Sequence, residues 1–130
     1  MPHSFGPMTA AATIAIAFFM TLALAIPHAH ADLERLDGAG IAAALSGKTI
    51  AGKRGGKIWM QTFDATGGTA YSVAGEAATQ GSWRVQEDRF CSQSPAAPAW
   101  VCYDIFRDGD LIVLIGENGE KWPALIADDN

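Results

Sequence analysis

Beyond Gly47 the chain is a succession of short stretches rich in β-branched, apolar and aromatic residues, each ended by glycine, aspartate or asparagine. This alternation is typical of antiparallel β structure, in which short strands are joined by tight turns. Thirteen of the 14 glycines lie after residue 31, in the part of the chain that contains these stretches. We expect strands over residues 48–52, 57–63, 69–73, 82–86, 89–92, 100–107, 111–115 and 121–126.

The connections between these stretches are short enough for consecutive strands to pair as hairpins. Asp108-Gly109 and Asn118-Gly119 favour tight hairpin turns, because glycine accepts the positive φ that such turns need. Residues 64–68 predict a longer hairpin loop, and residues 93–99, with two prolines, an irregular excursion. The pattern predicts a mainly β fold, either a small antiparallel meander or an eight-stranded barrel-like sheet.

One short helix is expected before the strands. Apolar residues recur at helical spacing, and Gly47 stands where a left-handed C-terminal glycine belongs. The helix is predicted from about residue 37 to residue 46, with Asp37 as its N-cap. Gly38 and Gly40 weaken it, so it must be held by the packing of Ile41 and Leu45 against another element.

The stretch from Leu111 to Ile115 is apolar at every position, whereas most other stretches alternate. We therefore expect a central strand that is covered by the core on one side and by the helix on the other. An exposed edge strand or a subunit interface is the alternative.

Residues 1–31 differ in composition from the rest of the chain: they contain 20 apolar residues and none of the 23 charged ones. Residues 10–26 are apolar apart from two threonines, and a small-x-small pattern ends at Ala31. We expect a secretory signal peptide over 1–31, followed by a single β-rich domain over 32–130 that is periplasmic or secreted and has no membrane span after processing. An uncleaved membrane anchor is the alternative, because this largely apolar stretch of 17 residues reaches the lower limit for a span.

Cys91 and Cys102 would then lie in an oxidising compartment, on two stretches predicted to be neighbouring strands. A disulfide across the hairpin is the expected state. A redox-active pair would need a spacing close to C-x-x-C, which these cysteines do not have.

Several short motifs occur in a characteristic order along the chain. They are Leu45-Ser-Gly47-Lys-Thr49, Phe63-Asp64-x-x-Gly67, Gly81-Ser-Trp83-Arg-Val85 followed by Asp88 and Cys91, Cys102-Tyr103, and Arg107-Asp-Gly109-Asp. In this order, over nearly all of residues 33–126, the chain resembles small exported proteobacterial proteins of unknown function. The resemblance implies a location in the cell envelope and a β-barrel-like body, and it carries over no catalytic or binding residue. Gly81-Ser-Trp83 also matches the G-x-W of lipocalin-like barrels, and we expect Trp83 to plug a barrel end beside a close-packed glycine.

The residue types available for catalysis are limited. All three histidines precede residue 32, so the domain has no histidine for a nucleophile scheme, for acid–base work or for a metal site. Glu87, Asp88 and Asp104 are the candidate paired carboxylates, but a turn explains the first two and an ion pair with Arg84, Arg89 or Arg107 explains the third. The acidic turns at 108–110 and 117–120 lack the spacing of a calcium loop. We therefore expect no enzyme activity, no metal and no cofactor.

A binding surface is expected at the ends of strands. Trp100 and Trp122 suit sugar stacking or anchoring in a partner, and the alternative for each is that it plugs a barrel end. Lys53, Arg54 and Lys57 form the densest positive patch. A formal charge of −5 opposes nucleic-acid binding.

The predicted function is that of a non-catalytic binding or envelope-accessory domain, with an envelope protein or a glycan as partner. The alternative is an inhibitor of a hydrolase, either a lysozyme or a protease, which would insert loop 93–99 or loop 53–57 into a substrate cleft. An apolar pocket or a flat aromatic face would favour the binding module.

Overall fold

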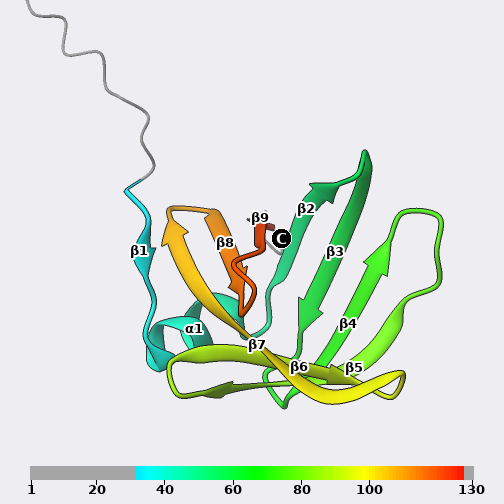
Figure 1. The fold of residues 1–130 in the computed structure, drawn as a ribbon, viewed down its shortest axis with the longest axis horizontal. Helices are drawn as coiled ribbons and strands as arrows, with labels where there is room; N and C mark the ends of the chain where they lie inside the picture. Colours follow the sequence, from blue (N-terminus) through cyan, green and yellow to red (C-terminus); the bar gives the residue numbers. More distant parts are fainter. Residues whose placement is uncertain (1–31, 128–130) are drawn as a thin grey trace, which may run out of the picture.

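The computed structural model describes residues 32–127 (Figure 1). The predicted signal peptide, residues 1–31, lies outside the described residues. Between residues 32 and 127, no helix has the length and apolar character needed to cross a membrane.

The described chain begins with a two-residue strand and one helix, β1 (Glu34–Arg35) and α1 (Gly38–Leu45). Eight consecutive strands follow, which are β2 (Thr49–Arg54), β3 (Lys57–Phe63), β4 (Gly68–Val73), β5 (Thr79–Gln86), β6 (Arg89–Ser94), β7 (Ala97–Asp108), β8 (Leu111–Gly116) and β9 (Lys121–Ala127). Each predicted strand is present, and its bounds agree with the prediction to within a few residues. Only β1 was not expected.

The strands β2 to β9 form a closed antiparallel barrel. Each pairs with the next along the chain, and β9 returns to pair with β2, where Ile50 lies opposite Ile126. β1 pairs with the end of β7 that extends beyond β6, with Glu34 opposite Arg107. The mainly β fold with one helix and an eight-stranded barrel is therefore confirmed.

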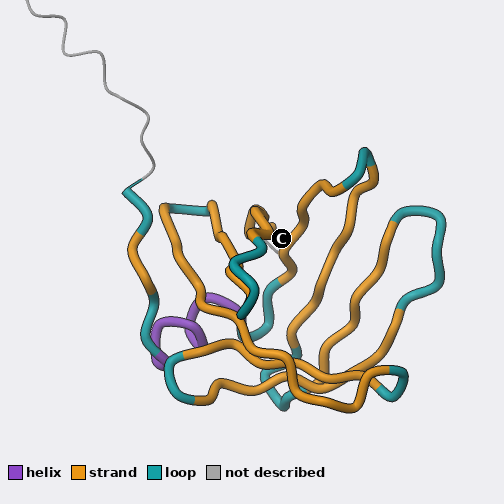
Figure 2. The backbone as a smooth tube through the Cα atoms, viewed as in Figure 1, coloured by secondary structure: helices purple, strands orange, loops and turns teal. Residues whose placement is uncertain are grey.

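Because neighbouring strands are antiparallel, the connections fall at two opposite ends of the barrel (Figure 2). The closed end contains α1 and the connections at 64–67, 87–88 and 109–110. The other end, called the mouth here, contains the connections at 55–56, 74–78, 95–96 and 117–120.

An aromatic cluster fills the closed end. Phe63 meets Trp83 and Phe90 edge to face, with ring centroids 5.4 and 5.3 Å apart. Ile41 and Leu45 of α1 belong to the same buried cluster and are fully inaccessible to solvent. Their burial explains why a helix with two glycines near its start is stable here.

Trp83 plugs the closed end as predicted. It is 7% exposed, and its Nε1 donates a hydrogen bond to the carbonyl oxygen of Asp64 at 2.8 Å. The close-packed glycine is Gly81, because a Cβ atom at that position would stand 2.2 Å from the carbonyl oxygen of Gln93.

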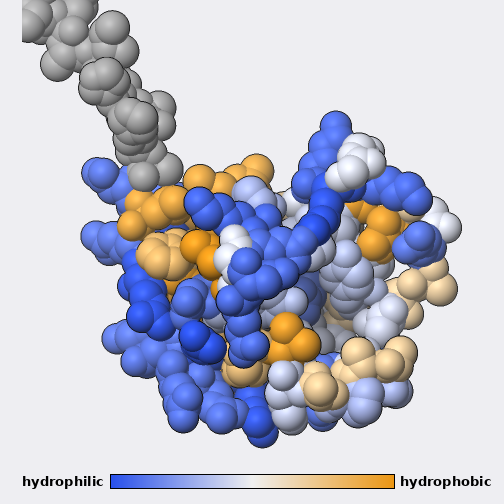
Figure 3. Space-filling model, in the orientation of Figure 1, coloured by the Kyte–Doolittle hydropathy of each residue, from blue (hydrophilic) through white to orange (hydrophobic). Residues whose placement is uncertain are grey.

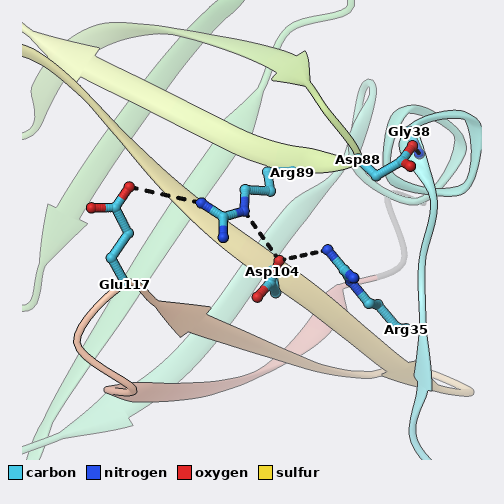
Figure 4. Close-up of polar contacts among 6 residues, drawn as sticks. All are labelled: Arg35, Gly38, Asp88, Arg89, Asp104 and Glu117. Carbon is cyan, nitrogen blue, oxygen red and sulfur yellow. Dashed lines mark hydrogen bonds and ion pairs between the residues drawn. The ribbon is translucent and has the colours of Figure 1, made fainter.

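Two carboxylates fix the N-terminus of α1. Asp37 is the N-cap, as predicted, and accepts a hydrogen bond from the backbone N–H of Gly40 at 2.8 Å. Asp88, in the β5–β6 turn, accepts from the backbone N–H of Gly38 at 2.7 Å (Figure 4). Asp88 and its neighbour Glu87 adopt positive φ, 56° and 52°. The helix is thus tied to the barrel wall by a tight turn without glycine.

The predicted irregular excursion at 93–99 is wrong. β6 continues to Ser94, which pairs with Ala97 of β7, so that only residues 95–96 connect the two strands. Pro95 fits because it lies in the turn. Pro98 fits because the pairing of β6 with β7 shifts register there, and a bulge tolerates a residue without an N–H donor.

The strand β8 is central as predicted, since it pairs with both β7 and β9. The expectation that α1 covers its outer side is wrong, because α1 packs at the closed end, near β5 and β6. Val113 faces outward and is still 8% exposed, since Phe106 and Pro123 flank it in the register. Apolar side chains gather in the same region at the upper left of Figure 3.

Candidate ligand-binding cavity

The barrel interior is packed at the closed end and hollow toward the mouth. The hollow is a cavity of about 340 Å³ that opens to solvent. Its lining comes from β3 to β9 and consists of Trp59, Gln61, Thr69, Tyr71, Thr79, Gly81, Phe90, Ser92, Gln93, Ser94, Ala97, Val101, Tyr103, Leu114 and Trp122.

The cavity exists because the inward-facing side chains of β5 and β6 become small toward the mouth. Along β6 the inward positions change from Phe90 to Ser92, and along β5 they change from Trp83 to Gly81 and then Thr79. Successive inward residues of a strand are two positions apart, so each step moves toward the mouth by one layer of the barrel. Along β5 and β6, bulky inward residues therefore fill the layer at the closed end, and small ones leave the next layer toward the mouth open.

Three aromatic side chains form one wall of the cavity. The ring of Trp59 lies 6.1 Å from that of Tyr71 in a tilted arrangement and 5.9 Å from that of Trp122 edge to face, measured between centroids. Trp59 has room for this position because its neighbour across the β2–β3 ladder is Gly52, where a Cβ atom would stand 2.6 Å from the indole. Rigid rings packed on one another give the cavity a fixed, apolar wall.

Tyr103 lines the cavity from β7. Its ring stacks on Phe90, with centroids 5.9 Å apart and planes inclined by 23°. Burial raises the pKa of its hydroxyl above the usual 10.0, the nearby Tyr71 raises that pKa further, and the positive charge of Arg54 lowers it. One residue of β2 and one of β4 therefore influence the pKa of this hydroxyl.

Two polar side chains form the floor between this cavity and the aromatic cluster. Gln61 donates from Nε2 to the Thr69 hydroxyl at 3.0 Å, and this hydroxyl donates to the carbonyl oxygen of Thr62 at 2.7 Å. Gln61 and Thr69 are both buried. Thr69 thus accepts from Gln61 and donates to Thr62, which removes most of the cost of placing these polar groups inside the barrel.

Arg54 stands at the mouth. Its guanidinium carbon lies 3.4 Å from the centroid of the Trp122 ring, and its Nη2 forms an ion pair with Glu120 from the β8–β9 turn. The buried Nε1 of Trp122 has no hydrogen-bond acceptor among the described residues. A cation, an indole N–H and the apolar wall are therefore adjacent.

The predicted binding residues separate into two groups. Trp122 and Arg54 come together at the cavity, although 67 other residues lie between them in the sequence. Lys53 is exposed, and Lys57 lies on the same hairpin with its Nζ 4.0 Å from Glu76. Trp100 is not in the lining, and the guanidinium carbon of Arg84 lies 3.9 Å from its ring centroid.

Sequence reasoning missed most of the lining. The sequence alone assigned Trp59, Gln61, Tyr71 and Tyr103 to no site. One signal was present, namely that a glutamine occupies an inward position between Trp59 and Phe63. A polar residue in an otherwise apolar inward row indicates an interior that is not purely a packed core.

The disulfide between Cys91 and Cys102 is present, and the two residues are directly opposed in the β6–β7 ladder. It lies on the barrel wall beside the bulge. The prediction of a hairpin disulfide is confirmed.

The acidic residues considered for catalysis make structural contacts instead. Asp104 forms ion pairs with Arg35 at 2.9 Å and with Arg89 at 3.3 Å, and Arg89 also lies 3.8 Å from Glu117 (Figure 4). The Arg35 contact joins β1 to the barrel. Asp104 therefore has the ordinary ion-pair explanation that the sequence suggested.

In residues 32–127, no group of three or more histidine, cysteine, aspartate or glutamate side chains is placed to hold a metal ion. Comparisons of the chain with protein-family models, with curated proteins and with solved structures give no match. The function is therefore inferred from the cavity itself.

Proposed function

We propose that the protein is a non-catalytic binding protein of the periplasm or cell exterior that holds a small, largely apolar molecule in the barrel cavity. The observation that carries this proposal is a hollow half-barrel, open at the mouth and lined by Trp59, Tyr71, Tyr103 and Trp122. Concave sites with aromatic walls and a few placed polar groups are the usual form of small-molecule sites.

The cavity volume limits the size of the ligand. Pockets for small molecules are commonly about 300–1,000 Å³, and the cavity of about 340 Å³ is at the lower end of that range. A dry cavity of about 150 Å³ already holds benzene. A molecule with one or two rings therefore suits this cavity better than a lipid or a polymer.

Binding without catalysis is supported by the kinds of group that line the cavity. They are aromatic rings, hydroxyls, amides and aliphatic chains, and both cysteines are joined in the disulfide on the barrel wall. The disulfide is also consistent with an oxidising compartment outside the cytoplasm.

Ligand-observed NMR with a set of one-ring and two-ring aromatic compounds tests the proposal. Ser92→Phe places a ring in the cavity, and Ser72→Phe places the same ring at a position of β4 outside the lining. We expect compounds that bind the wild type to bind Ser72→Phe equally well and Ser92→Phe at least about tenfold more weakly.

Two outcomes would contradict the proposal. Equal binding to both variants would place the ligand outside the cavity. Absence of binding by all compounds, together with stoichiometric inhibition of a lysozyme or protease that depends on the turns at 55–56 or 95–96, would establish the hydrolase inhibitor instead.

A further inference from the structure

We propose that the ligand is a planar apolar molecule with a single carboxylate, which Arg54 binds at the mouth while the rings of Trp59, Tyr71 and Trp122 hold its body. This inference rests on the proposed function, since it specifies the ligand of the same cavity. We infer the carboxylate from the hydrogen-bonding groups that the protein presents at the mouth.

The first observation is that the two polar groups at the mouth, the Arg54 guanidinium and the Trp122 indole N–H, are both donors. The indole N–H of Trp122 can only donate, and its nitrogen is buried without an acceptor in the described part of the chain. A guanidinium also has donors only, five N–H groups in a planar fork. A ligand at the mouth can reach the guanidinium N–H groups that Glu120 leaves free, and only acceptor atoms can satisfy them.

The second observation is that Arg54 is held in a fixed orientation with part of its fork uncommitted. Its guanidinium stacks on the Trp122 ring at 3.4 Å, and the ion pair with Glu120 is made through Nη2. Stacking on an aromatic ring restrains the plane of a guanidinium, and a restrained fork matches a carboxylate through two parallel hydrogen bonds.

The third observation concerns the number of charges that the mouth accepts. Lys57 lies opposite Arg54 in the β2–β3 ladder, and both cations have acidic neighbours, Glu76 and Glu120. A molecule with several negative charges would be repelled by these carboxylates and by the net charge of −5. A ligand with a single carboxylate therefore suits a mouth in which Arg54 is the cation stacked on Trp122.

The body of the ligand is apolar because the floor offers few free donors. The Gln61 amide nitrogen and the Thr69 hydroxyl already donate to acceptors in the protein. The wall above them consists of the three rings, whose flat surfaces favour a planar molecule.

The test compares 2-naphthoic acid with 2-naphthamide, which have the same ring system but differ in charge. Dissociation constants are measured by tryptophan fluorescence at neutral pH for the wild type, Arg54→Gln and Lys57→Gln. Lys57→Gln is the matched control, because it removes a cation from the same hairpin and leaves the stack of Arg54 on Trp122 in place.

We expect the wild type to bind the acid about tenfold or more tightly than the amide. Arg54→Gln should bind the two compounds with equal affinity, and Lys57→Gln should keep the wild-type ratio. Circular dichroism of each variant checks that the barrel is intact.

If the wild type binds acid and amide with equal affinity, and Ser92→Phe binds both more weakly, the ligand class is overturned but the cavity remains a binding site. The same acid preference in wild type and Arg54→Gln would overturn the role of Arg54. The carboxylate proposal would also be overturned if neither naphthalene compound binds while neutral one-ring compounds do. Weaker binding of those compounds by Ser92→Phe would then keep the cavity as the binding site. Failure of every compound, charged or neutral, would overturn the proposed function itself.

Discussion

Single residues in the barrel owe their chemistry to where the sheet places them. Tyr103 lines the cavity and its ring stacks on Phe90, so its hydroxyl is partly removed from water. Asp88 belongs to a two-residue turn, yet its carboxylate acts as a second cap for a helix 50 residues earlier in the chain. Neither role can be assigned from the neighbouring residues in the sequence.

The raised pKa of Tyr103 makes stability depend on alkaline pH. The folded protein keeps this hydroxyl neutral at a pH at which the unfolded chain, with a pKa near 10.0, already ionises. The stabilisation is present below pH 10 and is lost as the pH rises through the folded-state pKa. We expect the urea midpoint of the wild type to fall above pH 10 more steeply than that of Tyr103→Phe. Parallel curves for the two proteins between pH 8 and 11 would contradict this.

The contact of Asp88 with Gly38 should be measurable by comparing two neighbouring alanine variants. Both Glu87 and Asp88 have positive φ, so alanine is strained at each position to a similar extent. Only Asp88→Ala also removes the acceptor for the helix N-terminus. We expect it to lower the free energy of unfolding by about 1 kcal/mol more than Glu87→Ala. Equal losses in chemical denaturation would mean that the contact adds nothing.

At the scale of elements, the disulfide joins β6 to β7 immediately beside the bulge. Cys91 is fully buried, and the ladder on the mouth side of it is irregular. The covalent bond therefore holds together a hairpin whose backbone pairing is interrupted. The wall of the cavity that contains Ser92 and Val101 belongs to this hairpin.

Replacing both cysteines by serine should lower the free energy of unfolding by about 2–4 kcal/mol, since the short loop is no longer closed in the unfolded chain. Guanidinium unfolding of the variant and of the oxidised wild type measures the difference. Intact-mass analysis provides the control, because the wild type must be two hydrogens lighter than its reduced form. Two free thiols in protein isolated from the envelope would contradict the bond.

The elements were predictable because their signals are local. The bounds of β3, residues 57–63, follow from alternation, and α1 follows from Asp37 and Gly47 at its ends. The contact of Arg54 with Trp122 was not predictable, because it needs β9 to pair with β2 across the closure of the barrel. Hairpin patterns show which neighbours pair, whereas closure depends on the twist and stagger of all the strands together.

Considered as a whole molecule, the barrel divides into a packed half and a hollow half. The described helix and the aromatic cluster lie at the closed end, and the mouth contains four connections around a cavity. The apolar contacts that oppose unfolding are therefore concentrated at one end.

Hydrogen exchange should show this division. Amides of Ile50, Phe63 and Ile105, whose side chains are buried at the closed end, should exchange only through global unfolding. Amides next to the turns at 55–56 and 95–96 should exchange faster, through local opening. Uniform protection along each strand from one end to the other, measured by NMR at neutral pH, would contradict the division.

The separation of the mouth from the packed half has an evolutionary consequence. Substitutions in the four connections at the mouth change what can enter without touching the residues that make the chain fold. Under the proposed function, substitutions at Arg54 and Glu120 would change which ligand the mouth prefers and would leave the closed end unchanged. We therefore expect sequence variation among relatives to concentrate at the mouth rather than at the closed end.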